Sequence, residues 1–156
     1  GKLLQQWSLP LTSTPTLDPL PFFWHNLRAT LLILFFSSFT FGIAAILWAM
    51  LPVGLAGFMA GEAAQAGYNP LTFLVAFILP HGLVELTAVS LAAAFSLRLG
   101  MIVMDPPEGL TVGQAMLLAL ANYLKVMALV IPLLVLAAVL EAYLTPQIVS
   151  WVYRGP

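Results

Sequence analysis

Three side chains in this sequence could carry acid–base or ligand chemistry in apolar surroundings: His81, Glu85 and Glu141. His81 and Glu85 are four residues apart, so they share one face if the chain is helical through Gly82. Charged groups inside a membrane are costly, and they face the protein interior, pair with other groups or stay protonated. These three residues are therefore the candidate intramembrane site.

The positions of the two carboxyls indicate that they lie at the same depth. Glu85 lies near the start of an apolar segment over residues 83–104, and Glu141 lies near the end of another over residues 126–145. If the two segments run antiparallel, both carboxyls lie within roughly 3–6 Å of one membrane face, at about 1.5 Å of rise per residue. The prediction is one polar cluster of His81, Glu85 and Glu141 near the outer leaflet.

Several interpretations of this cluster are open. It could be a hydrogen-bond network that locks helices together with protonated carboxyls. It could be a proton or ion relay, or a zinc site with Glu141 as the third ligand. The groups could also simply lie at the interface. The sequence has no nucleotide-binding, nucleophile or His-Glu-x-x-His motif, so we expect no catalytic residue, metal or cofactor, and no enzyme activity.

Glycine and proline positions predict how the helices break and pack. Pro80 and Gly82 flank His81 and predict an interruption of the helix. Gly57 and Gly61 form a GxxxG pattern, which permits close approach of two helices.

Three further polar residues are secondary candidates. Lys125 is expected to be an end anchor whose ammonium group reaches the interface, and Glu62 a carboxylate at the water boundary. Asn26 opens the first expected span.

The composition fixes the environment in which these residues act. The chain has 156 residues, of which 62% are hydrophobic and 7% charged, and its mean hydropathy is +1.02. Soluble domains carry roughly a quarter charged residues, so a soluble globule is excluded, and so is a disordered chain. Five Lys and Arg against six Asp and Glu leave no basic patch for nucleic acid. The chain is an integral membrane protein without cysteine.

The apolar pattern predicts an all-α fold, a polytopic transmembrane helical bundle. We expect an extended N-terminal arm at the membrane surface (residues 1–25), a transmembrane core (26–146) and a C-terminal tail (147–156). The first span is expected over residues 26–50, and an interfacial helix over 110–124 leads into the last span. Residues 53–79 are expected to form a broken, re-entrant pair of half-helices, or alternatively one irregular crossing.

The distribution of Lys and Arg predicts the orientation. On the re-entrant interpretation, Lys2, Arg28, Arg98 and Lys125 fall on the cytoplasmic side and Arg154 falls outside, so the N-terminus is cytoplasmic. We expect a multi-pass protein of the cell membrane. Faces rich in Gly and Ala, with few spans to bury one another, favour a homodimer surrounded by membrane lipid.

Two motifs resemble those of a known bacterial membrane family. Residues 79–88 read LPHGLVELTA and are followed by an Ala-rich stretch ending in Arg98-Leu99-Gly100. Residues 137–146 read AAVLEAYLTP. The first resembles the Pro-His-Gly-x-x-Glu hallmark of the stage II sporulation protein M family, and the second resembles its small-residue helix that closes in Glu-aromatic-x-Thr-Pro. Asn26, Gly42 and the glycines of residues 54–61 fit the family's first span and glycine-bearing loop more loosely.

The resemblance implies a role rather than a reaction. The family's namesake is a membrane component of a complex that positions cell-wall hydrolases. It therefore implies a non-enzymatic scaffold or anchoring protein that binds partners in a cell-envelope complex, such as wall-remodelling proteins. An alternative is a small transporter or channel subunit whose path is lined by His81, Glu85 and Glu141.

Overall fold

The computed structural model describes residues 18–154, and all regular structure in this range is helical. Three stretches are long and apolar enough to cross a membrane: Ile43–Gln65, Pro70–Met101 and Val112–Tyr153. This confirms the predicted all-α membrane fold. In chain order the elements are α2 (Pro19–Phe39), α3 (Ile43–Gln65), α4 (Pro70–Phe73), the π-helical turn η1 (Leu74–Ile78), α5 (Leu79–Met101), α6 (Val112–Val139), the π-helical turn η2 (Leu140–Leu144) and α7 (Thr145–Arg154).

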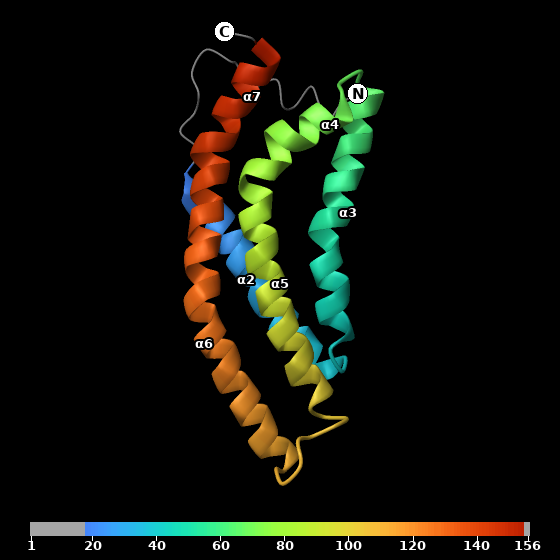
Figure 1. The fold of residues 1–156 in the computed structure, drawn as a ribbon, viewed down its shortest axis with the longest axis vertical. Helices are drawn as coiled ribbons and strands as arrows, with labels where there is room; N and C mark the ends of the chain where they lie inside the picture. Colours follow the sequence, from blue (N-terminus) through green and yellow to red (C-terminus); the bar gives the residue numbers. More distant parts are fainter. Residues whose placement is uncertain (1–17, 155–156) are drawn as a thin grey trace.

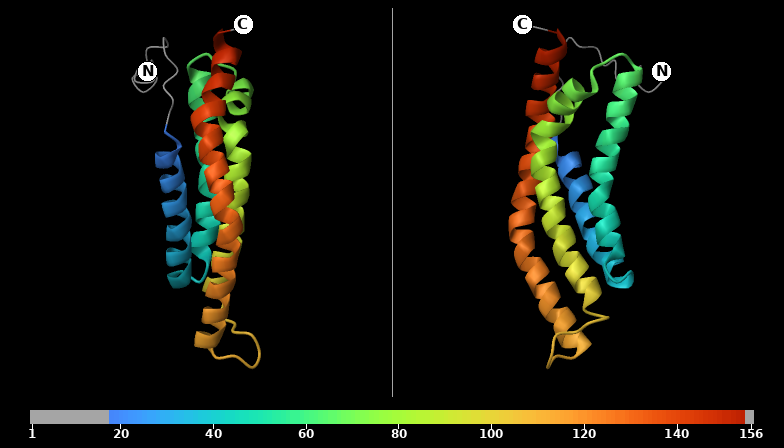
Figure 2. Two further views of the ribbon diagram at one scale, coloured as in Figure 1. Left: turned by 90° about the vertical axis from the view of Figure 1, so that its left-hand side faces the viewer. Right: turned by 45° about the vertical axis from the view of Figure 1, so that its right-hand side comes forward.

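The helices run alternately up and down the long axis of the molecule (Figure 1). α3, α5 and the continuous stretch from α6 to α7 form one layer, and α2 lies across one face of it (Figure 2). α2 packs against α5, α6 and α3. The start of α2 and the end of α7 lie toward one end of the bundle, and the loop of residues 102–111 lies at the other.

Local sequence signals start three of the helices. The Asp18 carboxylate accepts a hydrogen bond from the Leu20 backbone N–H at 3.0 Å, and the Asn69 side chain accepts from the N–H groups of Leu71 and Thr72. Each of these caps is followed by a proline, which suits the first helical turn. Thr111 and Gln114 form a reciprocal capping box at the start of α6. Gly67 and Asn69 lie in the turn between α3 and α4, and residues 105–109, with two prolines and a glycine, lie in the loop before α6, as these residue types favour.

The predicted boundaries of the first two spans are wrong. The expected span 26–50 is divided by a turn at residues 40–42, where Phe41 and Gly42 both have positive φ angles of 51° and 88°. The expected re-entrant pair over 53–79 is not found, and neither is a single crossing there. α3 runs unbroken through Pro52 to Gln65, and a second helical stretch begins at Pro70. The turn was missed because no polar residue other than Thr40 marks it.

Residues 110–124 continue into the last span as one helical stretch, as predicted, since the capping box starts a helix that runs to α7. Both terminal segments differ from expectation. α2 begins at Pro19, inside the expected arm, and α7 continues to Arg154, inside the expected tail. The rest of the arm, residues 1–17, lies outside the described residues.

The grouping of the cations is corrected as well. The helix order brings the end of α7 to the same end of the bundle as the start of α2, so Arg154 does not lie opposite the start of α2. Arg98 lies in the last turn of α5, next to the loop of residues 102–111.

The core is built mainly from small side chains. Alanines are completely or almost completely buried where α5 meets α6 and where α3 meets α5, and they allow close helix packing. The larger buried residues gather between α5 and α6: Tyr123, Met127, Val130 and Leu134. Most large apolar side chains on the outer faces are exposed, as expected in contact with lipid or with another protein.

Candidate functional site

The two motifs found in the sequence meet in space. His81, near the start of α5, and Thr145, at the start of α7, are both buried. His81 Nδ1 and Thr145 Oγ1 share a hydrogen bond of 3.1 Å. This bond fastens the start of α5 to the C-terminal stretch, between residues that are 64 positions apart in the chain.

The two carboxyls lie beside this hydrogen bond. Glu85 follows His81 by one helical turn, and Glu141 precedes Thr145 by about one turn of an antiparallel stretch. Both lie on the same side of the hydrogen bond, both are half-buried, and they lie near each other. The exposed His25 of α2 lies near Glu85. The structure thus brings His81, Glu85 and Glu141 to one region, with Thr145 and His25 as members that the sequence did not single out.

Both helices widen into a π-helical turn next to this region. η1 ends just before Leu79, and η2 contains Glu141 itself. α7 packs against η1, and α5 packs against η2. Single π-helical turns inside α-helices are rare and are frequently found at functional sites. Here one turn precedes His81 and the other carries Glu141, so the wider turns set where the polar groups of the two helices meet.

The predicted helix break at Pro80 and Gly82 is wrong. Both residues lie inside the first turn of α5, which continues without interruption to Met101. The missing N–H of Pro80 is tolerated because the preceding π-helical turn has already changed the hydrogen-bond pattern. A side chain at Gly82 would touch Ile78 of that turn at 3.2 Å.

A second set of buried polar residues, between α2 and α6, was not predicted as a cluster. The Tyr123 hydroxyl donates to the Thr30 carbonyl at 3.3 Å, and the Thr30 hydroxyl donates to the Asn26 carbonyl at 2.8 Å. Ser96 Oγ lies close to Tyr123 without meeting hydrogen-bond geometry. Asn26 is buried on this face of α2. The spacing of residues 26, 30 and 37 on one helical face was the available signal.

The glycines divide into two groups. Gly57 and Gly61 lie on the exposed face of α3, and a side chain at either position would meet nothing within 4 Å. The tight contact lies elsewhere. A side chain at Gly100 would collide with the backbone of Gly42 and Ser37, and one at Gly42 would collide with Leu97. The end of α5 is thus held against the α2–α3 turn by Gly42 and Gly100.

The remaining candidates face outward. Glu62 and Lys125 are exposed on α3 and α6. Within residues 18–154, no three His, Asp or Glu side chains are grouped to hold one metal ion, so the zinc interpretation has no ligand set in that range.

A model of one protein family matches residues 12–146, which is most of the chain and includes both motifs. The chain belongs to the stage II sporulation protein M family. An uncharacterized protein of the archaeon Methanocaldococcus jannaschii is 28% identical over 131 residues, covering 81% of this chain and 70% of that protein. No solved structure matches the chain significantly. In this family member the two motifs are joined in the structure, because His81 of the first motif and Thr145 of the second share a hydrogen bond.

Proposed function

We propose that this family member is a non-enzymatic membrane scaffold that anchors partner proteins in a cell-envelope complex. Family membership supports a membrane role, and the family resemblance implies partner binding. The proposal rests on the outward face of α3, which is apolar and has little contact with the rest of the chain. Gly57 and Gly61 open onto free space, and large apolar side chains of the same helix, such as Leu55 and Phe58, are mostly exposed.

This face has the form of an association surface. Without a hydrophobic driving force inside lipid, helices associate where small residues let backbones approach closely. α3 uses little of its surface for contacts within the chain, because only Ala45, Ala60 and Ala63 are buried along it. A second copy of the chain is the first partner we propose for this face, and envelope or wall-remodelling proteins would then bind the dimer.

Enlarging both glycines tests this proposal. We expect Gly57→Leu with Gly61→Leu to lower dimer formation by about fivefold to 150-fold, since overpacking a close helix contact costs about 1–3 kcal/mol. The chain has no cysteine, so Ala64→Cys on the same face of α3 gives a clean disulfide reporter in native membranes. Cross-linked dimer is quantified on non-reducing gels, with co-purified partners identified by mass spectrometry.

Two controls make this experiment specific. Gly113→Leu enlarges another outward glycine, on α6, and should leave the dimer unchanged. Ala121→Cys places the reporter on an exposed face of α6 and should give no dimer. Unchanged cross-linking in the double-leucine variant would reject the scaffold proposal. Proton flux into liposomes would then favour the alternative transport role, for which buried Ser37 and Ser96 hydroxyls without partners are the supporting observation.

We also propose that the N-terminus is cytoplasmic. The loop of residues 102–111 holds Asp105 and Glu108 but neither Lys nor Arg, as expected of an outside loop. In intact cells, a membrane-impermeant maleimide should label Glu108→Cys and should not label Gln147→Cys of α7, at the other end of the bundle. The reverse pattern would overturn the orientation, and labelling after lysis controls for accessibility.

A further inference from the structure

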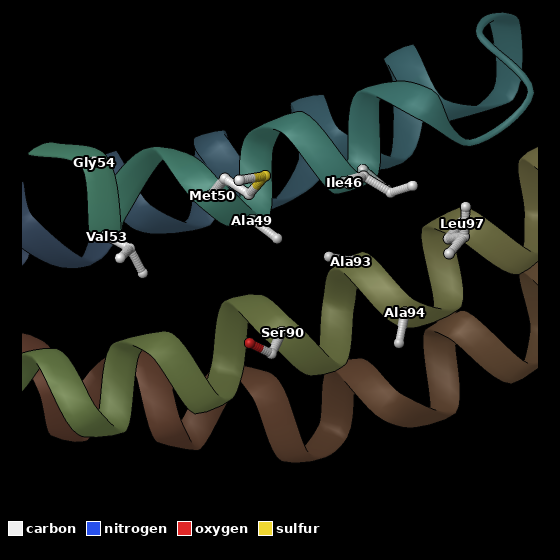
Figure 3. Close-up of a pocket in the computed structure, with 10 residues that line it drawn as sticks. Ile46, Ala49, Met50, Val53, Gly54, Ser90, Ala93, Ala94 and Leu97 are labelled. Atoms are coloured by element: carbon white, nitrogen blue, oxygen red, sulfur yellow. The ribbon is translucent and has the colours of Figure 1, made fainter.

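An apolar groove runs between α3 and α5 along the outer surface of the bundle (Figure 3). It has a volume of about 600 Å³. Ala45 and Ala93 are buried at its base, and its walls include Ala49 and Gly54 of α3. Ser90 is the polar side chain among the residues that line it, so the groove is built to hold hydrocarbon.

A second hollow continues this groove toward the end of α5. It has a volume of about 280 Å³ and shares Ala94 and Leu97 with the first. It is also lined by Arg98 and Asp105. Arg98 lies in the last turn of α5, and Asp105 lies in the loop that follows, so the second hollow is at the level where a bilayer gives way to water.

The two hollows together match the chemistry of one phospholipid. We propose that this site binds a membrane lipid whose headgroup carries both a phosphate and an ammonium group, as in phosphatidylethanolamine. The acyl chain lies in the α3–α5 groove, the phosphate pairs with Arg98, and the ammonium pairs with Asp105. Both side chains are exposed, and neither forms an ion pair with another residue within the described range, so both charges are free for a headgroup.

Charge favours this occupant over an apolar partner helix, which would leave Arg98 and Asp105 without partners. A cation and an anion that line the same hollow complement a zwitterion better than a purely anionic lipid, because Asp105 repels a headgroup without a cation.

Native mass spectrometry of the purified full chain tests the site. The chain is offered equal amounts of phosphatidylethanolamine, phosphatidylcholine and phosphatidylglycerol with the same acyl chains. We expect the first lipid to be retained about threefold to fivefold over the other two, the upper part of the range for an exposed ion pair. Phosphatidylglycerol has no cation for Asp105, and the methylated ammonium of phosphatidylcholine has no N–H to donate to it. Asp105→Asn should remove this preference while lipid is still bound. Arg98→Gln should lower retention of all three lipids by about fivefold.

Matched variants separate the site from general lipid contact. Arg28→Gln removes an exposed arginine of α2 and should change nothing. Ala94→Leu fills the groove and should lower retention of every lipid, whereas Ala128→Leu on an exposed face of α6 should not. Equal retention of the three lipids by the wild type, or equal behaviour of the two arginine variants, overturns the proposal. The comparison of Ala94→Leu with Ala128→Leu does not involve Arg98. If Arg98→Gln fails to fold, this comparison still tests the proposal.

Discussion

Gly100→Ala is expected to destabilise the protein by about 3 kcal/mol or more, the upper part of the range for overpacked cores. The added methyl group would collide with the backbone nitrogen of Gly42 and the carbonyl oxygen of Ser37. Both are main-chain atoms, so no change of side-chain rotamer can make room. α5 would have to move away from the α2–α3 turn, and the packing of Leu97 against the buried cluster that includes Ile33 and Ala45 would be lost with it.

The protein is held in mild detergent and unfolded by titration with SDS. The loss of helix is monitored by circular dichroism, and the SDS concentration at the midpoint of unfolding is compared between variants. Gly113→Ala is the matched control, because it makes the same chemical change in a helix, away from the proposed association face of α3, where a side chain meets nothing within 4 Å. The control should be neutral or stabilising by up to about 1 kcal/mol, from helix propensity alone. Similar midpoints for the two variants would show that α5 is not held at this turn.

Thr145→Val is expected to cost about 1–2 kcal/mol. Valine has nearly the shape of threonine, but it leaves a nitrogen of the buried His81 ring without its partner at 3.1 Å. The penalty for an unsatisfied buried group is about 1–3 kcal/mol, although hydrogen bonds between membrane helices often contribute less than about 1 kcal/mol. The burial of both partners places this one toward the upper end of the membrane range.

The same SDS titration measures this effect. Thr87→Val is the matched control, because the Thr87 hydroxyl bonds only to the Leu83 carbonyl of its own helix and is exposed. A double-mutant cycle with His81→Ala isolates the pairwise energy. If Thr145→Val costs no more than Thr87→Val, the two motifs are not joined by this bond.

Much of the fold could be predicted from composition and apolar run length. A charge content of 7% leaves only a membrane fold, and the turns at residues 67–70 and 105–109 follow from Gly, Pro and Asn. The α2–α3 turn could not be predicted. Its sequence, Thr40-Phe41-Gly42, lies within an apolar run. The turn satisfies its polar groups locally, through the 2.9 Å bond from Gly42 N–H to the Ser37 carbonyl and the 3.0 Å bond from Ala44 N–H to the Thr40 hydroxyl. One threonine and one glycine in an apolar run are too weak a signal to mark such a turn.

The site shows the same division. Motif spacing and span direction predicted that His81, Glu85 and Glu141 lie together near one membrane face, and the structure brings them to one region. The shallow depth predicted for Glu85 is wrong, because its helical stretch begins at Pro70 and not at residue 83. The role of Thr145 depends on a contact between residues far apart in the chain, which no local pattern encodes. Likewise, GxxxG spacing marked Gly57 and Gly61, whereas the tight internal contact uses Gly42 and Gly100. One sequence cannot tell which glycine faces a neighbouring helix.

The stretch from Val112 to Tyr153 is helical over 42 residues. At about 1.5 Å per residue it is roughly 63 Å long, about twice the thickness of a bilayer's hydrocarbon core. α2, with 21 residues, is only as long as that core is thick. The longest helical stretch therefore cannot lie upright within the hydrocarbon core, so it must tilt steeply or project beyond the core at one end or both.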